Sequence, residues 1–122
     1  GPVRLRATVR GTQIDTGFVD CMEFAVRALH RALPPDTEVL CCQSCAHGNF
    51  CPIGDREDEI FCMADVVPRA IRDVWRVTED GAERESRARR LLSFCDRYRE
   101  IGDGAPYAYN DWNSRVKRNR EA

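Results

Sequence analysis

Cysteine spacing constrains what this chain can fold into more than any other feature of its sequence. The segment 41–62, CCQSCAHGNFCPIGDREDEIFC, holds five of the seven cysteines in a chain of 122 residues. The other residues of this segment are mostly polar or typical of loops, so it has little apolar surface of its own to bury. The segment therefore depends on something else for its stability, and the role of the cysteines decides what that is.

Four roles can be compared for these cysteines. Buried thiols, which behave as small apolar residues, are disfavoured because the polar sequence around them offers nothing to pack against. Disulfides suit secreted proteins, whereas the number of cysteines here is odd and no signal peptide is recognisable. A redox C-x-x-C motif opens a helix, but Gly48, Asn49 and Pro52 follow CQSC and indicate a loop. The sequence therefore favours a metal centre.

The spacing of Cys42 and Cys45 is that of a zinc knuckle, in which two thiolates three residues apart face one ion. A tetrahedral zinc ion would also staple a polar loop that lacks a core of its own. The predicted zinc ligands are Cys42, Cys45, Cys51 and Cys62. Three residues are alternative fourth ligands, namely Cys95, Cys21 and His47. Cys41 is expected to be packed, because it points away from Cys42 along an extended chain.

Two resemblances to known proteins rest on the cysteines and the residues around them. The spacing Cys21-x20-Cys42-x2-Cys45-x5-Cys51 resembles that of the WhiB-like iron–sulfur regulators, although this chain has GDREDEIFCM in place of their Gly-Trp-Gly turn. That resemblance implies a [4Fe–4S] cluster and a redox- or gas-sensing role in transcription. The stretches CQSCAHGNFCP, IFC and SFCDRY resemble small cysteine-rich accessory proteins of bacterial phages and mobile elements. This second resemblance implies a nucleic-acid-binding factor or an inhibitor of a host defence system.

Hydrophobic periodicity predicts both strands and helices along the chain. Residues 3–10, VRLRATVR, alternate apolar and polar side chains, mostly arginine, and predict a half-buried strand. Short strands are also expected over 13–15 and 37–40. Helices are predicted over about 17–33, 66–77 and 83–100, with a short terminal helix from about residue 110. His30, beside two arginines on a helix flank, is expected at the surface.

These elements predict one α+β domain over residues 3–122, with Gly1 and Pro2 typical of a tag remnant. A small N-terminal β-hairpin or sheet and three to four helices would surround the metal-stapled loop 41–62. Residues 107–122 would form a basic C-terminal helix or tail.

Charge is distributed unevenly along the chain and favours a partner-binding role. Residues 53–83 carry four basic and nine acidic side chains, whereas residues 84–122 carry ten basic and six acidic ones. Basic residues interleaved with aromatic ones can bind phosphates and stack on bases, but acidic residues among them would equally make a salt-bridged surface. The residues predicted to bind a protein or nucleic-acid partner are Arg84, Arg87, Arg90, Arg115, Lys117, Arg118 and Trp112.

The sequence carries no recognisable catalytic motif, such as a phosphate-binding loop, a dinucleotide fingerprint or a nucleophile elbow. It also lacks an apolar run near the roughly 20 residues that a membrane helix requires. We therefore expect a cytoplasmic protein that acts neither on a small-molecule substrate nor at a membrane. The predicted function is that of a small zinc-stapled accessory protein that binds a protein or a nucleic acid, with an iron–sulfur regulator as the alternative.

Overall fold

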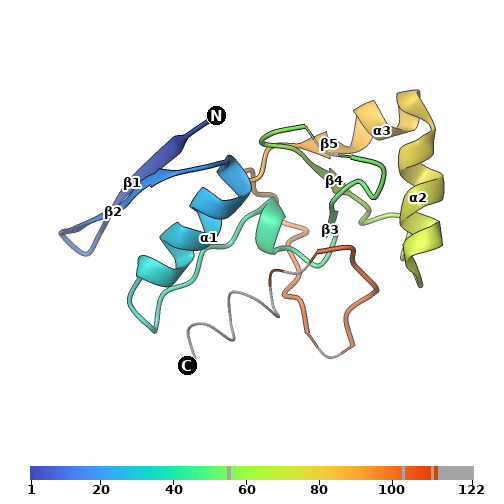
Figure 1. Ribbon diagram of the computed structural model, residues 1–122. Helices are drawn as coiled ribbons and strands as arrows, with labels where there is room; N and C mark the ends of the chain where they lie inside the picture. Colours follow the sequence, from blue (N-terminus) through green and yellow to red (C-terminus); the bar gives the residue numbers. More distant parts are fainter. Residues whose placement is uncertain (55, 103, 111, 113–122) are drawn as a thin grey trace.

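The computed structural model describes residues 1–54, 56–102, 104–110 and 112. Two small antiparallel sheets and three α-helices make up the regular structure of these residues, so the α+β class is confirmed. In Figure 1 the first hairpin and α1 lie on one side, α2 and α3 lie on the other, and a small three-stranded sheet lies between them. None of the helices in the described part of the chain is long and apolar enough to cross a bilayer.

The N-terminal hairpin pairs β1 (Val3–Val9) with β2 (Thr12–Val19). Arg10 and Gly11 connect the strands with φ angles of 51° and 80°, the backbone that a two-residue hairpin turn requires. The second strand is longer than predicted, and the helix expected from about residue 17 begins five residues later. The reason is that Gly17 has a φ of 70°, which no α-helix accommodates, and the chain pairs with β1 beyond it.

Helix α1 (Met22–Ala32) packs against both strands of the hairpin and ends before Pro34, where the prediction ended it. Its buried face includes Ala25, Val26 and His30. The expectation of a surface His30 is wrong, because its side chain is only 4% exposed. The His30 Nδ1 atom accepts a hydrogen bond from the Val39 amide, and the ring packs against Trp112 at a centroid distance of 5.0 Å.

The second half of the molecule combines two short helices with the three-stranded sheet. Helix α2 (Ile71–Glu79) and helix α3 (Gly81–Arg87) follow one another directly. The sheet has the order β3 (Gly48–Asn49), β4 (Ile60–Cys62) and β5 (Ala88–Arg89). The helix predicted over 83–100 is therefore wrong beyond Arg87, where the chain pairs with β4. The strand expected over 37–40 is not formed.

Strand β4 lies between two hydrophobic clusters because its successive side chains point to opposite faces. Ile60 belongs to a cluster shared with α1, and Phe61 belongs to a cluster shared with α2. The first cluster consists of Val26, Cys41, Phe50, Ile60, Leu91 and Trp112. The second consists of Cys51, Phe61, Met63, Val74 and Val77. The cysteine-rich segment thus runs through the centre of the molecule, where both clusters support it.

Candidate metal centre

Four cysteine side chains line one small pocket, together with His47. These cysteines are Cys42, Cys45, Cys62 and Cys95. The pocket encloses about 20 Å³, which is room for a single ion or water molecule and too little for an organic ligand. None of the four thiols is in a disulfide. Three separate parts of the chain thus contribute cysteines to the lining of one small pocket.

The first two thiols lie on a tight turn. Residues Cys42–Ser44 form a single 3₁₀ turn, and the Cys45 amide donates to the Cys42 carbonyl over 3.3 Å. The Cys45 sulfur accepts two backbone N–H bonds, from His47 at 3.4 Å and from Arg99 at 3.5 Å. The turn therefore presents two backbone donors to the Cys45 sulfur.

Cys62 is at the end of β4, and pairing of β4 with β3 places it beside this turn. Gly48 lies opposite Cys62 in the ladder, and its amide donates to the Cys45 carbonyl over 2.9 Å. A Cβ atom on Gly48 would lie 2.2 Å from the Cys42 carbonyl oxygen, well inside van der Waals contact. The strand can approach the turn this closely only because residue 48 has no side chain.

The fourth thiol comes from the segment that follows β5. This segment returns beside the turn, where the Cys42 amide donates to the Ser93 carbonyl and the Ala46 amide to the Arg99 carbonyl, both over 2.7 Å. Cys95 lies between these two anchoring points and is exposed. The backbone on both sides of Cys95 is therefore tied to the turn that carries Cys42 and Cys45.

Burial and neighbouring charges shift the pKa values of two groups at the pocket. Burial, followed by the neighbouring cysteines, raises the pKa of Cys42 to about 11. The cysteine contribution is repulsion among thiolates, which a divalent cation in the pocket would relieve. Burial, and then Arg97 and Arg99, lower the pKa of His47. This keeps the imidazole neutral at pH 7, the form in which it can bind a metal.

The thiols share the pocket without forming a finished coordination sphere. Among the residues that the structure describes, no three histidine, cysteine or acidic side chains are arranged so that they could hold a metal ion. The predicted metal-stapled loop is therefore not shown.

Of the four predicted ligands, Cys42, Cys45 and Cys62 line this pocket and Cys51 does not. Cys51 is 4% exposed and packs with Phe61, Met63 and the buried face of α2. Cys21 lines a different pocket, beside Glu23 and Phe50. The four cysteines of the iron–sulfur alternative thus lie in three different places. Cys95, one of the alternative fourth ligands, does line the pocket.

Most of the predicted partner-binding residues that the structure describes are engaged within the molecule. Arg87 is buried to all but 13% and forms ion pairs with Asp65 at 2.6 Å and with Glu83 at 3.1 Å. Arg84 donates to the Thr78 carbonyl, and Trp112 is 6% exposed in the core, so it cannot stack on a base. Arg90 is 84% exposed and lies 3.7 Å from Asp58. Arg115, Lys117 and Arg118 fall outside the described residues.

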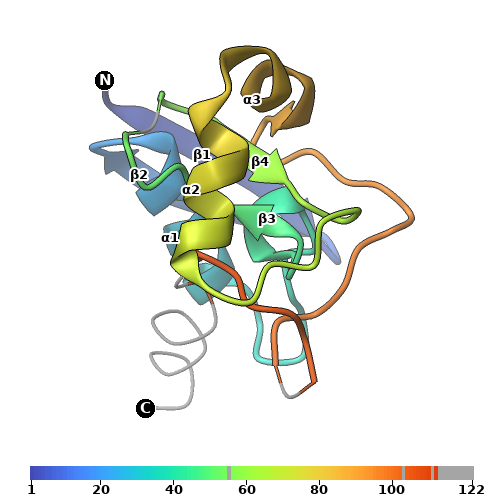
Figure 2. The ribbon, with the colours of Figure 1, turned by 90° about the vertical axis from the view of Figure 1, so that its right-hand side faces the viewer.

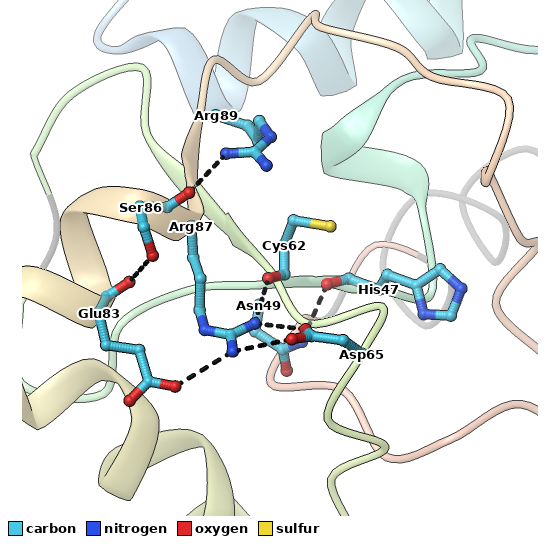
Figure 3. A network of polar contacts seen from close by, with 8 residues as sticks. All are labelled: His47, Asn49, Cys62, Asp65, Glu83, Ser86, Arg87 and Arg89. Carbon is cyan, nitrogen blue, oxygen red and sulfur yellow. Dashed lines mark hydrogen bonds and ion pairs between the residues drawn. The ribbon is translucent and has the colours of Figure 1, made fainter.

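Arg87 supports the cysteine pocket by holding the backbone of Cys62, one of the residues that line it. Figure 3 shows its guanidinium between Asp65 and Glu83, with one nitrogen donating to the Cys62 carbonyl over 3.1 Å. The Cys62 sulfur points away from Arg87. Helix α3 therefore fixes the end of β4 through this arginine, and with it the position of the Cys62 thiol.

We expect Arg87→Met to lower the free energy of unfolding by about 2–3 kcal/mol, because it removes charge-assisted hydrogen bonds from a nearly buried side chain. Arg90→Met is the matched control and should change this free energy by less than about 0.5 kcal/mol, since its ion pair is long and exposed. Chemical denaturation of the two variants measures both values. Equal effects would contradict the supporting role of Arg87.

The ion pair between Arg87 and Asp65 predicts that the stability of the protein depends on pH. Hydrogen bonding to Arg87 lowers the pKa of Asp65 below its usual value. The stabilisation from this pair is therefore fully present above about pH 4 and is lost as the pH falls through the lowered pKa of the folded state. Arg87→Met should lack this part of the acid-induced loss of stability, which denaturation at a series of acidic pH values would measure.

Comparisons with protein-family models, with curated proteins and with solved structures found no match for this chain. Its function therefore has to be inferred from the chemistry of the pocket and of the surface.

Proposed function

We propose that this chain is a zinc-stapled accessory protein that acts by binding a macromolecular partner. The proposed zinc ligands are Cys42, Cys45, Cys62 and Cys95. The observation that carries the proposal is the convergence of these four thiols on one pocket of about 20 Å³.

Zinc fits this pocket better than an iron–sulfur cluster does. Four thiolates around one small space match the tetrahedral Cys₄ site of structural zinc. A [4Fe–4S] cluster is larger than the pocket, and two of the cysteines proposed for it, Cys21 and Cys51, lie elsewhere. Arg89 and Arg97 also line the pocket and would offset the net negative charge of a zinc ion bound by four thiolates.

Such a centre would serve the fold rather than catalysis. Four protein ligands leave no open position for a water molecule or a substrate. The ion would join the 3₁₀ turn, the end of β4 and the segment that follows β5. The binding energy of a structural zinc ion is folding energy, so the ion would stabilise these segments as one unit. Function would then lie on the surface that the centre supports.

Elemental analysis of protein purified under reducing conditions tests the proposal. We expect a colourless protein with one zinc ion per chain. Because zinc must displace protons from thiols such as Cys42, whose pKa is raised, zinc retention should fall from about pH 7 to about pH 5. A chromogenic chelator would follow the release. A brown protein that contains iron, or a chelator-treated protein with unchanged thermal stability, would contradict the proposal.

A further inference from the structure

The outer face of α2 exposes two large apolar side chains next to each other. Ile71 and Trp75 lie one turn apart on the helix and are 44% and 45% exposed. The opposite side of the helix buries Val74, Val77 and Thr78. In Figure 1 α2 is the outermost element on its side of the molecule, and in Figure 2 it faces the viewer in front of the small sheet. The exposed side of α2 is thus an outer surface of the fold.

Three exposed arginines, Arg69, Arg72 and Arg76, lie on or next to this helix, and exposed Glu79 follows Trp75 by one turn. The arginines form no ion pair within the described part of the chain, although the charges of Arg76 and Arg72 help to lower the pKa of Asp73. Elsewhere on the surface, arginines such as Arg4 and Arg10 pair with aspartates. We call Arg69, Ile71, Arg72, Trp75 and Arg76 the α2 face. It contains tryptophan and arginine, two residue types that are enriched in interaction hot spots.

A groove of about 450 Å³ adjoins the α2 face and shares Arg69 and Arg76 with it. Val66, Val67 and Val77 supply its apolar lining. Val67 is 68% exposed and has a φ of 24°, a conformation that β-branched residues rarely adopt. Strained residues of this kind concentrate at ligand-binding sites. The groove is large enough to accept an apolar side chain from a partner.

The charges around the groove decide which kind of partner fits. Its two carboxylates are engaged internally, because Asp73 accepts hydrogen bonds from two backbone amides and Glu83 pairs with Arg87. Both would still repel the continuous negative charge of a nucleic acid backbone. Separate carboxylates on a protein segment could reach the three arginines and avoid Asp73 and Glu83. An apolar side chain between them would fill the groove.

We propose that the α2 face and its groove form the docking surface for an acidic segment of a partner protein that also presents an apolar side chain. The proposal rests on the binding role proposed above, but it does not depend on the identity of the metal. It assigns partner recognition to Arg69, Arg72, Arg76 and Trp75, in place of the arginines of α3.

Selection from a random peptide library displayed on phage tests this surface. Immobilised protein should enrich peptides in which Asp or Glu flanks Leu, Phe or Trp. Synthetic versions of these peptides should lose at least about tenfold in affinity on Trp75→Ala, measured by fluorescence anisotropy. The double variant Arg72→Glu, Arg76→Glu should abolish their binding and should instead select basic peptides.

Arg31→Glu is the matched control, because Arg31 is also exposed but lies on α1. It should leave peptide affinity unchanged. Enrichment of basic peptides by the unmodified protein, or affinities that do not respond to Trp75→Ala, would overturn the proposal. Tighter binding of a DNA oligonucleotide at the same residues would assign the surface to nucleic acid. Dimerisation that Trp75→Ala abolishes would assign it to a second copy of the chain.

Zinc content and thermal stability measured on the same samples separate this inference from the metal proposal. The α2 variants should keep their zinc content, because none of their side chains lines the cysteine pocket. If the purified protein contains no zinc but still binds acidic peptides, the metal proposal is contradicted and the docking surface is supported. If the protein contains zinc but selects no acidic peptides, the docking surface is contradicted and the metal proposal is supported.

Discussion

Replacing Cys95 with alanine is expected to release the zinc and to lower the thermal midpoint by at least about 10 °C. The side chain is exposed, so its removal costs little packing, and the loss would come almost entirely from the missing metal ligand. The effect should therefore disappear when both proteins are compared in excess chelator. Elemental analysis and thermal unfolding with and without chelator measure the two parts.

Cys51→Ala is the control that distinguishes the two ligand sets. Cys51 is buried in the cluster with Phe61 and Met63, so its truncation should cost about 1 kcal/mol of stability whether or not a chelator is present. The variant should keep its zinc. The opposite result, in which Cys51→Ala loses the ion and Cys95→Ala retains it, would restore the ligand set predicted from spacing and reject the one proposed from the pocket.

Gly48→Ala should be the second most damaging single change. The added methyl group would lie 2.2 Å from the Cys42 carbonyl oxygen and 3.0 Å from the Ile60 side chain. Because the first of these contacts is with backbone, β3 would have to move away from the turn that carries Cys42 and Cys45. We expect a loss of about 3 kcal/mol in the free energy of unfolding and weaker zinc retention.

Gly81→Ala provides the comparison for Gly48→Ala. A methyl group at Gly81 would meet nothing within 4 Å, and the residue begins α3. Its replacement should leave stability unchanged or raise it by up to about 1 kcal/mol. Denaturant titration of both variants gives the difference. A Gly48→Ala protein within about 0.5 kcal/mol of the unsubstituted chain would mean that β3 does not need its close approach to the turn.

Local patterns predicted the parts of the fold that depend on local chemistry. Alternation in residues 3–10 predicted β1, and Pro34 and Pro35 predicted the end of α1, because strand faces and proline geometry act within a few residues. The helix expected over 83–100 was wrong for a different reason. Leu91, Cys95 and Tyr98 have helical spacing, but pairing of residues 88–89 with β4 overrides it.

The candidate site shows the same division between local and distant effects. The spacing of Cys42 and Cys45 predicted a turn that brings two thiols together, and the structure places both in one pocket. The position of Cys51 could not be predicted, because the residues that bury it come from β4 and α2. His30 and Trp112 bury each other across the chain, which no pattern around either residue indicates.

Arginine pairing was equally hidden from the sequence. Arg84, Arg87 and Arg90 looked like a basic surface because they recur every three residues. Arg87 is in fact held by Asp65, a residue far from it in the chain. Asp73 lies between the arginines of α2 in the sequence, but in the structure it accepts hydrogen bonds from two backbone amides. Charge counts alone do not distinguish engaged arginines from available ones.

The return of the segment after β5 to the cysteine turn has a consequence for biosynthesis. The Cys45 sulfur and its Arg99 donor are 54 residues apart, so a long loop must close before the pocket is complete. Three of its thiols leave the ribosome well before Cys95 does. During that interval the other three cysteines of the pocket are present without the fourth. Folding of this protein is therefore expected to be slow relative to helical domains of its size, and to depend on a reducing environment until the last thiol arrives.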